Sequence, residues 1–563
     1  MIGTRPQGPL YHLGAMSRWR TILAVVGAAI ALVGVLPARA LASTTEQSSL
    51  LDDDQLIYSS PKHMVQTLQT LHALGVDVVK VSVVWQLIAP NANSSRRPNF
   101  DATNPAAYPP GAWSRWDTLV ETAQQLGMKV YFLVIGPAPV WAVPPANRTS
   151  QGPSLGWMPN PADYRNFIEA VGRRYNGTYV DPPPPAPGNG LPPVGGITVP
   201  TTTLPGTASG SSASAAAPIP RVSNWGIWNE PNERSWLVPW YRQAGRRRVL
   251  IQPQEYRALV DAGWQGLQAS SHTGDTILVG ETANRGIMSP VPFMRALYCV
   301  GGNLRPLSGT AAANDGCPSS SSSFVSQHPG LFSGAYAHHP YGFEAPPNRR
   351  DPEQGFITLY NMPSFERTLN RIFASYGQHP SGGVSLYLTE WGFKTNPPNP
   401  YVRTTPAQQA AWINQGEYMT WRWPYVHGLT QFLLVDSPPK PGTKKGSALY
   451  WSTFQTGLEY INGTKKPSFQ SFMVPIWLPV QRHGRHVTVW GQLRPAAHNV
   501  IQYGEIEFQR KGSSSWKELT LVQTDSPEGF VYNHVSIPSA GNVRLGWLDP
   551  DGSVFYSRVV PVT

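Results

Sequence analysis

The sequence is poor in charge and lacks long apolar runs beyond its N-terminus. Charged residues make up 14% of the 563 residues, against about 25% in an average globular protein. The apolar share of 41% is too high for a disordered chain. No stretch after residue 42 reaches the roughly 18 consecutive apolar residues of a membrane-spanning helix. Although the net charge is +11, the basic residues are scattered apart from three arginines at 246–248, which are typical of a solvated loop. These features predict a globular protein with no nucleic-acid partner.

The first 42 residues contain no acidic residue and have the three regions of a secretion signal. Arg18 and Arg20 form a basic region, residues 21–36 are uncharged and mostly apolar, and residues 38–42 contain small-x-small cleavage patterns. We therefore predict a signal peptide over residues 1–42 and a secreted or extracytoplasmic location. An uncleaved anchor is the alternative, although the apolar stretch is short for a membrane span.

Cysteine is scarce. The chain has only two, Cys299 and Cys317. In an exported protein two cysteines at this spacing predict one disulfide. They lack CxxC spacing and a neighbouring histidine cluster, so the sequence implies no metal site and no cofactor.

Between residues 50 and 472 short apolar runs alternate with amphipathic stretches. This alternation predicts a parallel sheet with helices on its faces. Eight candidate strands fit a (β/α)₈ barrel over residues 43–472 with long insertions. A doubly wound open sheet is the alternative, but no GxGxxG motif follows a predicted strand. The predicted strands are 54–58, 77–85, 129–135, 222–228, 276–280, 334–338, 384–388 and 429–435.

Two regions depart from this alternation. Residues 181–220 are rich in Pro, Gly, Ser and Thr and carry no charge after Asp181, which predicts a disordered insertion within the barrel. From residue 473 to 563 short strands with intervening Gly, Ser and Asp predict an all-β sandwich. The predicted fold class is therefore α/β, a (β/α)₈ TIM barrel with a C-terminal all-β sandwich domain.

Two glutamates lie where predicted strands end. Glu230 stands in a Trp-Asn-Glu-Pro run after the fourth strand, and Glu390 in a Thr-Glu-Trp-Gly run after the seventh. In a (β/α)₈ barrel the C-terminal strand ends face the catalytic mouth. Glycoside hydrolysis needs one carboxyl group to protonate the leaving oxygen and another to attack the anomeric carbon or activate water. For either glutamate alone, a salt bridge or a place beside a helix cap is the structural alternative.

The two motifs together resemble clan A of the glycoside hydrolases, which are retaining (β/α)₈ enzymes that include the cellulase-like family 5 and the xylosidase-like family 39. The resemblance covers about residues 50–472. It implies that Glu230 is the acid/base, that Glu390 is the nucleophile and that Asn229 binds the sugar 2-hydroxyl. Lys80 stands where many members have an arginine, so its contact with the nucleophile would be a single point.

Other residues match the clan more loosely. His339 and Tyr341 would orient Glu390 and the substrate, although a core or loop role is the alternative for the histidine. Residues 137–141 resemble the third-strand loop of xylosidase-like and galactosidase-like members, which disfavours cellulose as the substrate. The candidates for stacking on sugar rings are Trp85, Trp141 and Trp391, and core packing is the alternative for each. Rival acids at strand ends or close to them are Glu233, Glu281 and Asp436.

The sequence thus predicts a secreted retaining glycosidase that acts on O-glycosyl bonds of an oligo- or polysaccharide. Glu390 would attack, and Glu230 would first donate and then accept a proton. Like-charge repulsion from Glu390 would help to keep Glu230 protonated before the reaction. Two alternatives stay open, a non-catalytic carbohydrate-binding or cell-envelope protein on the same barrel and a transglycosylase with the same glutamates. The sugar, its anomer and the oligomeric state are left open.

Overall fold

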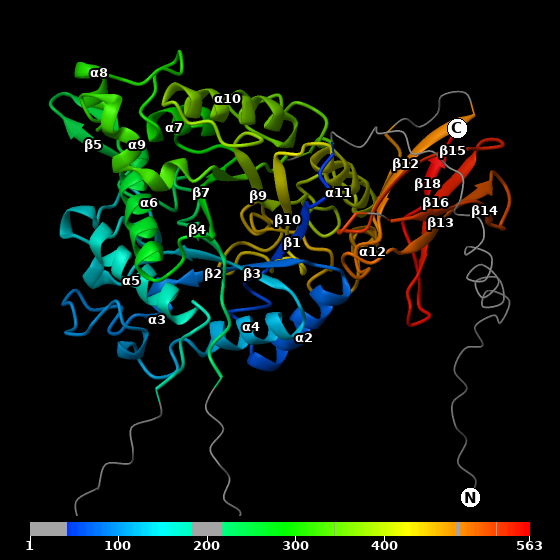
Figure 1. The fold of residues 1–563 in the computed structure, drawn as a ribbon, viewed down its shortest axis with the longest axis horizontal. Helices are drawn as coiled ribbons and strands as arrows, with labels where there is room; N and C mark the ends of the chain where they lie inside the picture. The colour runs from blue at the N-terminus through cyan, green and yellow to red at the C-terminus, as the bar shows by residue number, and fades with distance from the viewer. Residues whose placement is uncertain (1–41, 183–216, 343, 480–484, 525) are drawn as a thin grey trace, which may run out of the picture. The chain divides into compact units, whose positions relative to one another are not determined.

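The computed structural model describes residues 42–182, 217–342, 344–479, 485–524 and 526–563. Eight parallel strands close into a barrel in the order β1-β10-β9-β8-β7-β4-β3-β2 (Figure 1). The predicted barrel is confirmed. Residues 1–41 of the predicted signal peptide and residues 183–216 of the predicted insertion lie outside the described residues. No helix in the described ranges is long and apolar enough to span a membrane.

Seven of the predicted barrel strands overlap the observed ones, but the first prediction is wrong. Strand β1 precedes the predicted residues 54–58, because a run of three aspartates ends it. The carboxylate of Asp52 accepts the N–H groups of Leu434 and Val435, each at 3.0 Å, and so ties the end of β1 to the chain after β10. The barrel strands are β1 (Gln47–Leu51), β2 (Val78–Val84), β3 (Lys129–Ile135), β4 (Asn224–Ile227), β7 (Thr276–Ala283), β8 (Ala335–His339), β9 (Ser385–Trp391) and β10 (Val426–Phe432).

Most of the long helices carry proline in their first turn, where the missing N–H would have no helical partner. The Ser60 and Thr405 side chains cap two of these helices by accepting backbone N–H groups of the first turn. The α-helices are α2 (Pro61–Ala73), α3 (Trp85–Ile88), α4 (Ser114–Gln125), α5 (Pro161–Arg174), α6 (Gln252–Ala269), α7 (Pro290–Leu297), α8 (Gly309–Asn314), α9 (Phe324–Gln327), α10 (Met362–Ser375), α11 (Pro406–Trp421) and α12 (Pro467–Met473).

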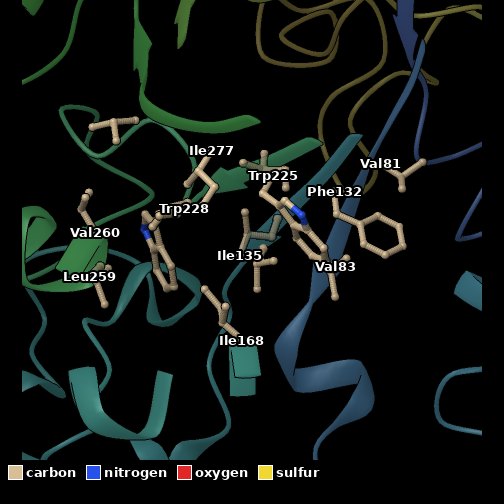
Figure 2. Packing of buried hydrophobic residues seen from close by; sticks show 14 of the residues in the cluster. Val81, Val83, Phe132, Ile135, Ile168, Trp225, Trp228, Leu259, Val260 and Ile277 are labelled. Atoms are coloured by element: carbon tan, nitrogen blue, oxygen red, sulfur yellow. The ribbon is translucent and has the colours of Figure 1, made fainter. Parts of the chain in front are cut away.

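A large apolar core lies between the barrel strands and the helices α5 and α6 (Figure 2). Trp225 and Trp228 are fully buried in it. Two tyrosines of these helices also bind the strands, since the Tyr164 hydroxyl donates to the carbonyl of Val134 and the Tyr256 hydroxyl to that of Ile227. The burial of these side chains and the two hydrogen bonds fix the C-terminal ends of β3 and β4. Glu230 lies in the loop that follows β4.

The structure describes both ends of the predicted insertion, residues 181–182 and 217–220. The Asp181 carboxylate lies 2.7 Å from the guanidinium of Arg174. Ile219 is buried, and its N–H donates to the carbonyl of Tyr179 at 2.8 Å. The ion pair therefore holds Asp181 at the N-terminal end of the predicted insertion, and apolar burial holds Ile219 at its C-terminal end.

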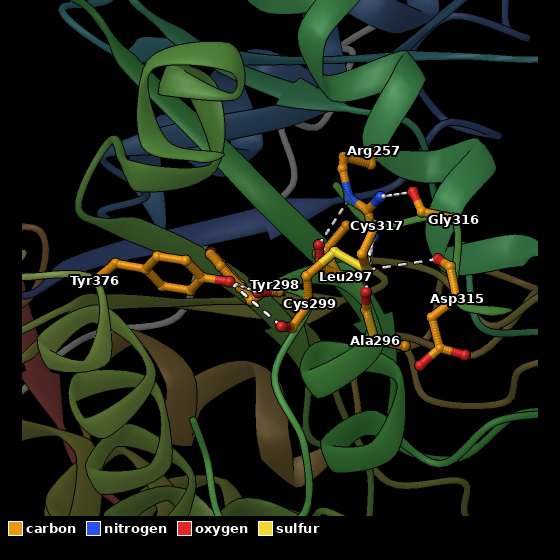
Figure 3. The surroundings of a disulfide bond; sticks show 9 residues. All are labelled: Arg257, Ala296, Leu297, Tyr298, Cys299, Asp315, Gly316, Cys317 and Tyr376. Carbon is orange, nitrogen blue, oxygen red and sulfur yellow. Dashed lines mark hydrogen bonds between the residues drawn. A yellow bond between two sulfur atoms is a disulfide. The ribbon is translucent and has the colours of Figure 1, made fainter. Parts of the chain in front are cut away.

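The predicted disulfide between Cys299 and Cys317 is confirmed (Figure 3). The side chain of Arg257 binds both ends of the loop that the disulfide closes. It donates to the carbonyls of Ala296 and Leu297 on one side and to that of Gly316 on the other. The disulfide closes the loop between Cys299 and Cys317, and the Arg257 guanidinium holds both ends of that loop to helix α6.

Replacing both cysteines by serine is expected to lower the free energy of unfolding by about 3 kcal/mol, because the unfolded chain regains the freedom of an 18-residue loop. Denaturant unfolding of the oxidised protein and the double variant measures this difference. Dithiothreitol should destabilise the wild type by a similar amount and leave the variant unchanged. Equal stabilities of the oxidised wild type and the variant would contradict the expectation.

The C-terminal region consists of two small antiparallel sheets, which confirms the predicted sandwich. One sheet has the order β11-β12-β15 and the other β14-β13-β16-β17, with β18 also paired to β16. Their shared core includes Val489, Ile506 and Leu545. The strands are β11 (Ile476–Trp477), β12 (His486–Gln492), β13 (Tyr503–Arg510), β14 (Lys517–Gln523), β15 (Phe530–Ser536), β16 (Gly541–Leu548), β17 (Val554–Tyr556) and β18 (Val560–Val562). A separate hairpin of β5 (Tyr241–Ala244) and β6 (Arg247–Leu250) contains the three arginines at 246–248.

Buried polar contacts join the sandwich to the barrel. The Arg494 guanidinium lies 2.7 Å from the Glu417 carboxylate of α11, and Arg558 donates to the Asn414 side chain of the same helix at 3.0 Å. The chain also packs tightly here, because a Cβ atom on Gly75 would lie 2.5 Å from the backbone of Arg494. The sandwich therefore contacts the barrel through buried polar groups and close backbone packing.

Candidate active site

A cavity of about 820 Å³ opens at the C-terminal ends of the barrel strands. Glu230, which follows β4, and Glu390, at the end of β9, both line it. The barrel thus brings together the two glutamates that the sequence singled out, although 160 positions separate them. The C-terminal strand ends are where (β/α)₈ enzymes carry their active sites.

The two carboxyl groups lie close together beside one imidazole. An oxygen of Glu230, an oxygen of Glu390 and a ring nitrogen of His339 all lie within 4.8 Å of one another. His339 Nδ1 is 2.9 Å from Glu230 Oε1 and 3.6 Å from Glu390 Oε2. The barrel therefore holds the two carboxyl groups and the imidazole as one cluster.

The loop that carries Glu230 has an unusual backbone. Trp228 and Glu230 have φ angles of 63° and 37°, in the left-handed region that side chains other than glycine rarely adopt. The buried indole of Trp228 donates to the carbonyl of Trp236, and the Glu230 N–H donates to the carbonyl of Glu281 at 2.9 Å. Packing and hydrogen bonds therefore hold a strained turn that directs the Glu230 side chain into the cavity.

Glu390 is held from both sides of its carboxylate. The Tyr341 hydroxyl donates to Oε2 at 3.1 Å, and the Lys80 ammonium lies 3.5 Å from Oε1. The next residue, Trp391, points the opposite way along the strand and packs so closely on α11 that a Cβ on Gly416 would lie 2.2 Å from its ring. This alternation places Glu390 on the cavity side.

A buried third carboxylate, that of Glu281, lies beneath the pair. Its Oε2 accepts from Lys80 Nζ at 2.9 Å, from His339 Nε2 at 2.8 Å and from the Thr389 hydroxyl at 3.0 Å. The Tyr131 hydroxyl donates to its Oε1. Glu281, Lys80 and His339 are fully buried. Glu281 is therefore not the substrate-binding rival that its strand-end position suggested, and Lys80 binds two carboxylates rather than the substrate.

The electrostatics of this group favour charged forms. Burial by itself would lower the pKa of His339, but the carboxyl groups of Glu390, Glu230 and Glu281 outweigh it and raise the pKa to about 9. Burial opposes ionisation of Glu281, yet Lys80 and His339 hold its pKa at about 2. The pKa of Lys80 is raised despite burial by Glu281 and Glu390. At neutral pH two cations and the Glu281 anion therefore lie behind the cavity.

Burial raises the pKa of Glu390, while the opposite charges of His339 and Lys80 counteract that rise. These two cations therefore favour the ionised carboxylate that a nucleophile requires.

The three predicted stacking tryptophans do not line the cavity, and this prediction is wrong. Trp85 stacks on Phe167 of α5 with ring centroids 5.0 Å apart. Trp141 packs edge-on against Trp85, and its indole donates to the carbonyl of Pro90. Trp391 is buried against α11. Phe432 at the end of β10 lines the cavity, and the other aromatic residues that line it come from segments without a stacking motif: Tyr58, Trp236, Tyr341, Tyr401, Trp451 and Phe454.

Asn229 lies on the cavity wall, and its buried Oδ1 has no hydrogen-bond partner within the described residues. An unpartnered buried oxygen next to Glu230 suits a substrate hydroxyl donor. Among the rival acids, Glu233 lines the cavity but accepts the Ser235 N–H at 2.7 Å. Asp436 instead forms a buried ion pair with Lys466 at 2.7 Å.

The sequence reasoning missed Asp53, which lines the cavity beside Ser82. Its carboxyl group accepts the Ser82 N–H at 3.1 Å, and burial raises its pKa to about 6. The signal was the run of three aspartates at 52–54, but the misplaced first strand put this run at the start of a strand instead of at its C-terminal end.

No family model and no curated protein matches the chain. Solved structures that resemble it include a family 39 glycoside hydrolase from Bacteroides cellulosilyticus (11% identity, 88% of this chain and 81% of that chain, TM-score 0.44). A glucosidase from Croceicoccus marinus matches at 11% identity over 92% of this chain and 96% of its own, with a TM-score of 0.43. The GH5_18 structure from Streptomyces cattleya in complex with GlcNAc matches at 11% identity over 77% and 79%, with a TM-score of 0.40. These neighbours are glycoside hydrolases, but TM-scores below 0.5 are too low to assign an activity to this chain.

Proposed function

We propose that the protein is a retaining glycosidase that hydrolyses O-glycosyl bonds of an oligo- or polysaccharide. The observation that carries the proposal is the closeness of the Glu230 and Glu390 carboxyl oxygens, within 4.8 Å of each other on the wall of one cavity. Two carboxyl groups at this separation suit a double displacement. The disulfide between Cys299 and Cys317 supports the predicted extracytoplasmic location, because disulfides persist in oxidising compartments.

In the first step Glu390 attacks the anomeric carbon while Glu230 protonates the departing oxygen, so that a glycosyl-enzyme forms. In the second step the Glu230 carboxylate takes a proton from water, which attacks the anomeric carbon and releases Glu390. The free Oδ1 of Asn229 would accept a substrate hydroxyl group during both steps. The Tyr341 hydroxyl, 3.1 Å from Glu390 Oε2, would keep the nucleophile oriented.

The buried charges behind the cavity support the assignment of Glu390 as the nucleophile and Glu230 as the acid/base. The positive charges of Lys80 and His339 are balanced by the negative charges of Glu281 and ionised Glu390. The two cations favour the ionised form of Glu390, and the Glu230 carboxyl group lies next to it, 2.9 Å from His339 Nδ1, where it can exchange a proton with the departing oxygen.

A panel of aryl glycosides with different sugars and anomers tests the function, with Glu390→Gln as the inactive control. The proposal predicts hydrolysis of at least one member by the wild type and none above background by the variant. If no glycoside is cleaved but sugars bind, the non-catalytic carbohydrate-binding alternative is correct. Products extended by an added acceptor sugar would indicate a transglycosylase instead.

A further inference from the structure

Three potential metal ligands meet at the opposite end of the barrel from the cavity. Asp77 immediately precedes β2, at the N-terminal ends of the strands. His498 lies in the sandwich segment after β12, and Glu528 lies just before β15. One oxygen of each carboxylate and one nitrogen of His498 lie within 4.8 Å of one another. The site is therefore built from both the barrel and the sandwich.

The distances between these groups are compatible with a bound ion. His498 Nε2 is 2.9 Å from Asp77 Oδ1 and 3.3 Å from Glu528 Oε2. Two ligands bonded at about 2.1 Å to one tetrahedral or octahedral ion lie about 3.0–3.4 Å apart. The contact between His498 and Asp77 also suits a hydrogen bond, whereas Glu528 Oε2 is buried without one.

The buried carboxylate of Glu528 lacks adequate compensation for its charge. The residue is only 8% exposed. Asp77 brings a second carboxylate close to it, and the basic groups that act on it are His498 and Lys129. Two carboxylates with oxygens within 4.8 Å of each other would be stabilised by a divalent cation between them.

The ligands are also held in place before any ion binds. The second oxygen of Asp77 accepts the Ser48 N–H at 2.7 Å, and the Gln492 side chain donates to the Glu528 carbonyl at 2.7 Å. Such outer hydrogen bonds orient ligands in metal sites. The His498 side chain is 41% exposed, which leaves a path for the ion and room for water ligands.

We propose that Asp77, His498 and Glu528 bind one divalent transition-metal ion, Zn²⁺ or Mn²⁺, that fastens the sandwich to the barrel. An imidazole with two carboxylates suits these ions, whereas Ca²⁺ and Mg²⁺ prefer all-oxygen sites. Because the site lies at the end of the strands opposite Glu230 and Glu390, its role is structural. The ion would displace any proton on His498 Nε2, so its affinity falls as the pH is lowered.

Thermal unfolding of the full chain after chelator treatment tests the proposal. Added Zn²⁺ or Mn²⁺ is expected to raise the Tm by at least about 2 °C, with one ion bound per chain, while Ca²⁺ and Mg²⁺ have no such effect. His498→Ala and Glu528→Gln should each remove the rise. His486→Ala replaces another exposed histidine of the sandwich and should retain it.

One further variant separates this site from the group of Glu230, His339 and Glu390, which also brings three potential ligands together. Glu230→Gln should keep both the Tm rise and the bound ion. Loss of the ion in Glu230→Gln, or its retention in His498→Ala, would overturn the proposal. The absence of a Tm rise with either transition metal would also overturn it. The three side chains would then form only ion pairs between the sandwich and the barrel. These measurements need no substrate, so they stand apart from the proposed glycosidase activity.

Discussion

In Glu230→Ala, the glycosyl-enzyme is expected to form at a nearly normal rate from an aryl glycoside whose phenol leaves without protonation. Its hydrolysis should then be slow, because no base activates water, and a burst of phenol should precede slow turnover. For substrates with poor leaving groups the loss should be about 10²–10⁴-fold, the usual contribution of a general acid/base. Stopped-flow and steady-state measurements across a series of leaving groups give these rates.

Azide and Glu390→Ala provide the matched controls. Azide is a small anion that needs no base, so it should enter the space left by the Glu230 side chain and restore turnover as glycosyl azide. In Glu390→Ala no glycosyl-enzyme can form, and a good leaving group should not help. Equal losses in both variants on every leaving group, without azide rescue, would show that the two roles are wrongly assigned.

Glu281→Gln is expected to lower kcat by about 10²-fold with a smaller change in KM, although the side chain does not reach the cavity. The substitution removes the negative charge that holds Lys80 and His339 behind the two glutamates, and small displacements of catalytic groups cost about this much. His339 then loses one of the carboxylates that raise its pKa to about 9. The basic limb of the kcat/KM profile should therefore move to lower pH.

Thr389→Val is the control for this variant, because it removes one hydrogen bond to the same Glu281 oxygen without changing the charge. It should lower the Tm while the basic limb stays in place. If Glu281→Gln lowers only the Tm and keeps the wild-type pH profile, Glu281 is merely a structural residue.

The parts of the account that the sequence predicted depend on local signals. Alternating strand and helix patterns indicated the barrel, and the two short motifs placed Glu230 and Glu390 at strand ends that a barrel necessarily brings to one mouth. The disulfide needed only two cysteines and an export signal. Each of these inferences uses residues that are neighbours in sequence or a rule of the fold.

The parts that it missed depend on packing between distant segments. Lys80, Glu281 and His339 come from three strands, and only the closed barrel shows that they form one buried group. The tryptophan predictions failed for a related reason. Trp85 starts a short helix directly after β2, and its ring turns outward onto α5, which the sequence pattern does not reveal.

Trapping the covalent intermediate tests the central claim most directly. A 2-deoxy-2-fluoro glycoside with a good leaving group, matched to the sugar identified in the panel, slows both steps and slows the second enough for the glycosyl-enzyme to accumulate. The account predicts that mass spectrometry finds one sugar per chain and that peptide mapping places it on Glu390. A sugar attached to another residue, or turnover without any adduct and with inversion at the anomeric carbon, would contradict the double displacement by Glu230 and Glu390.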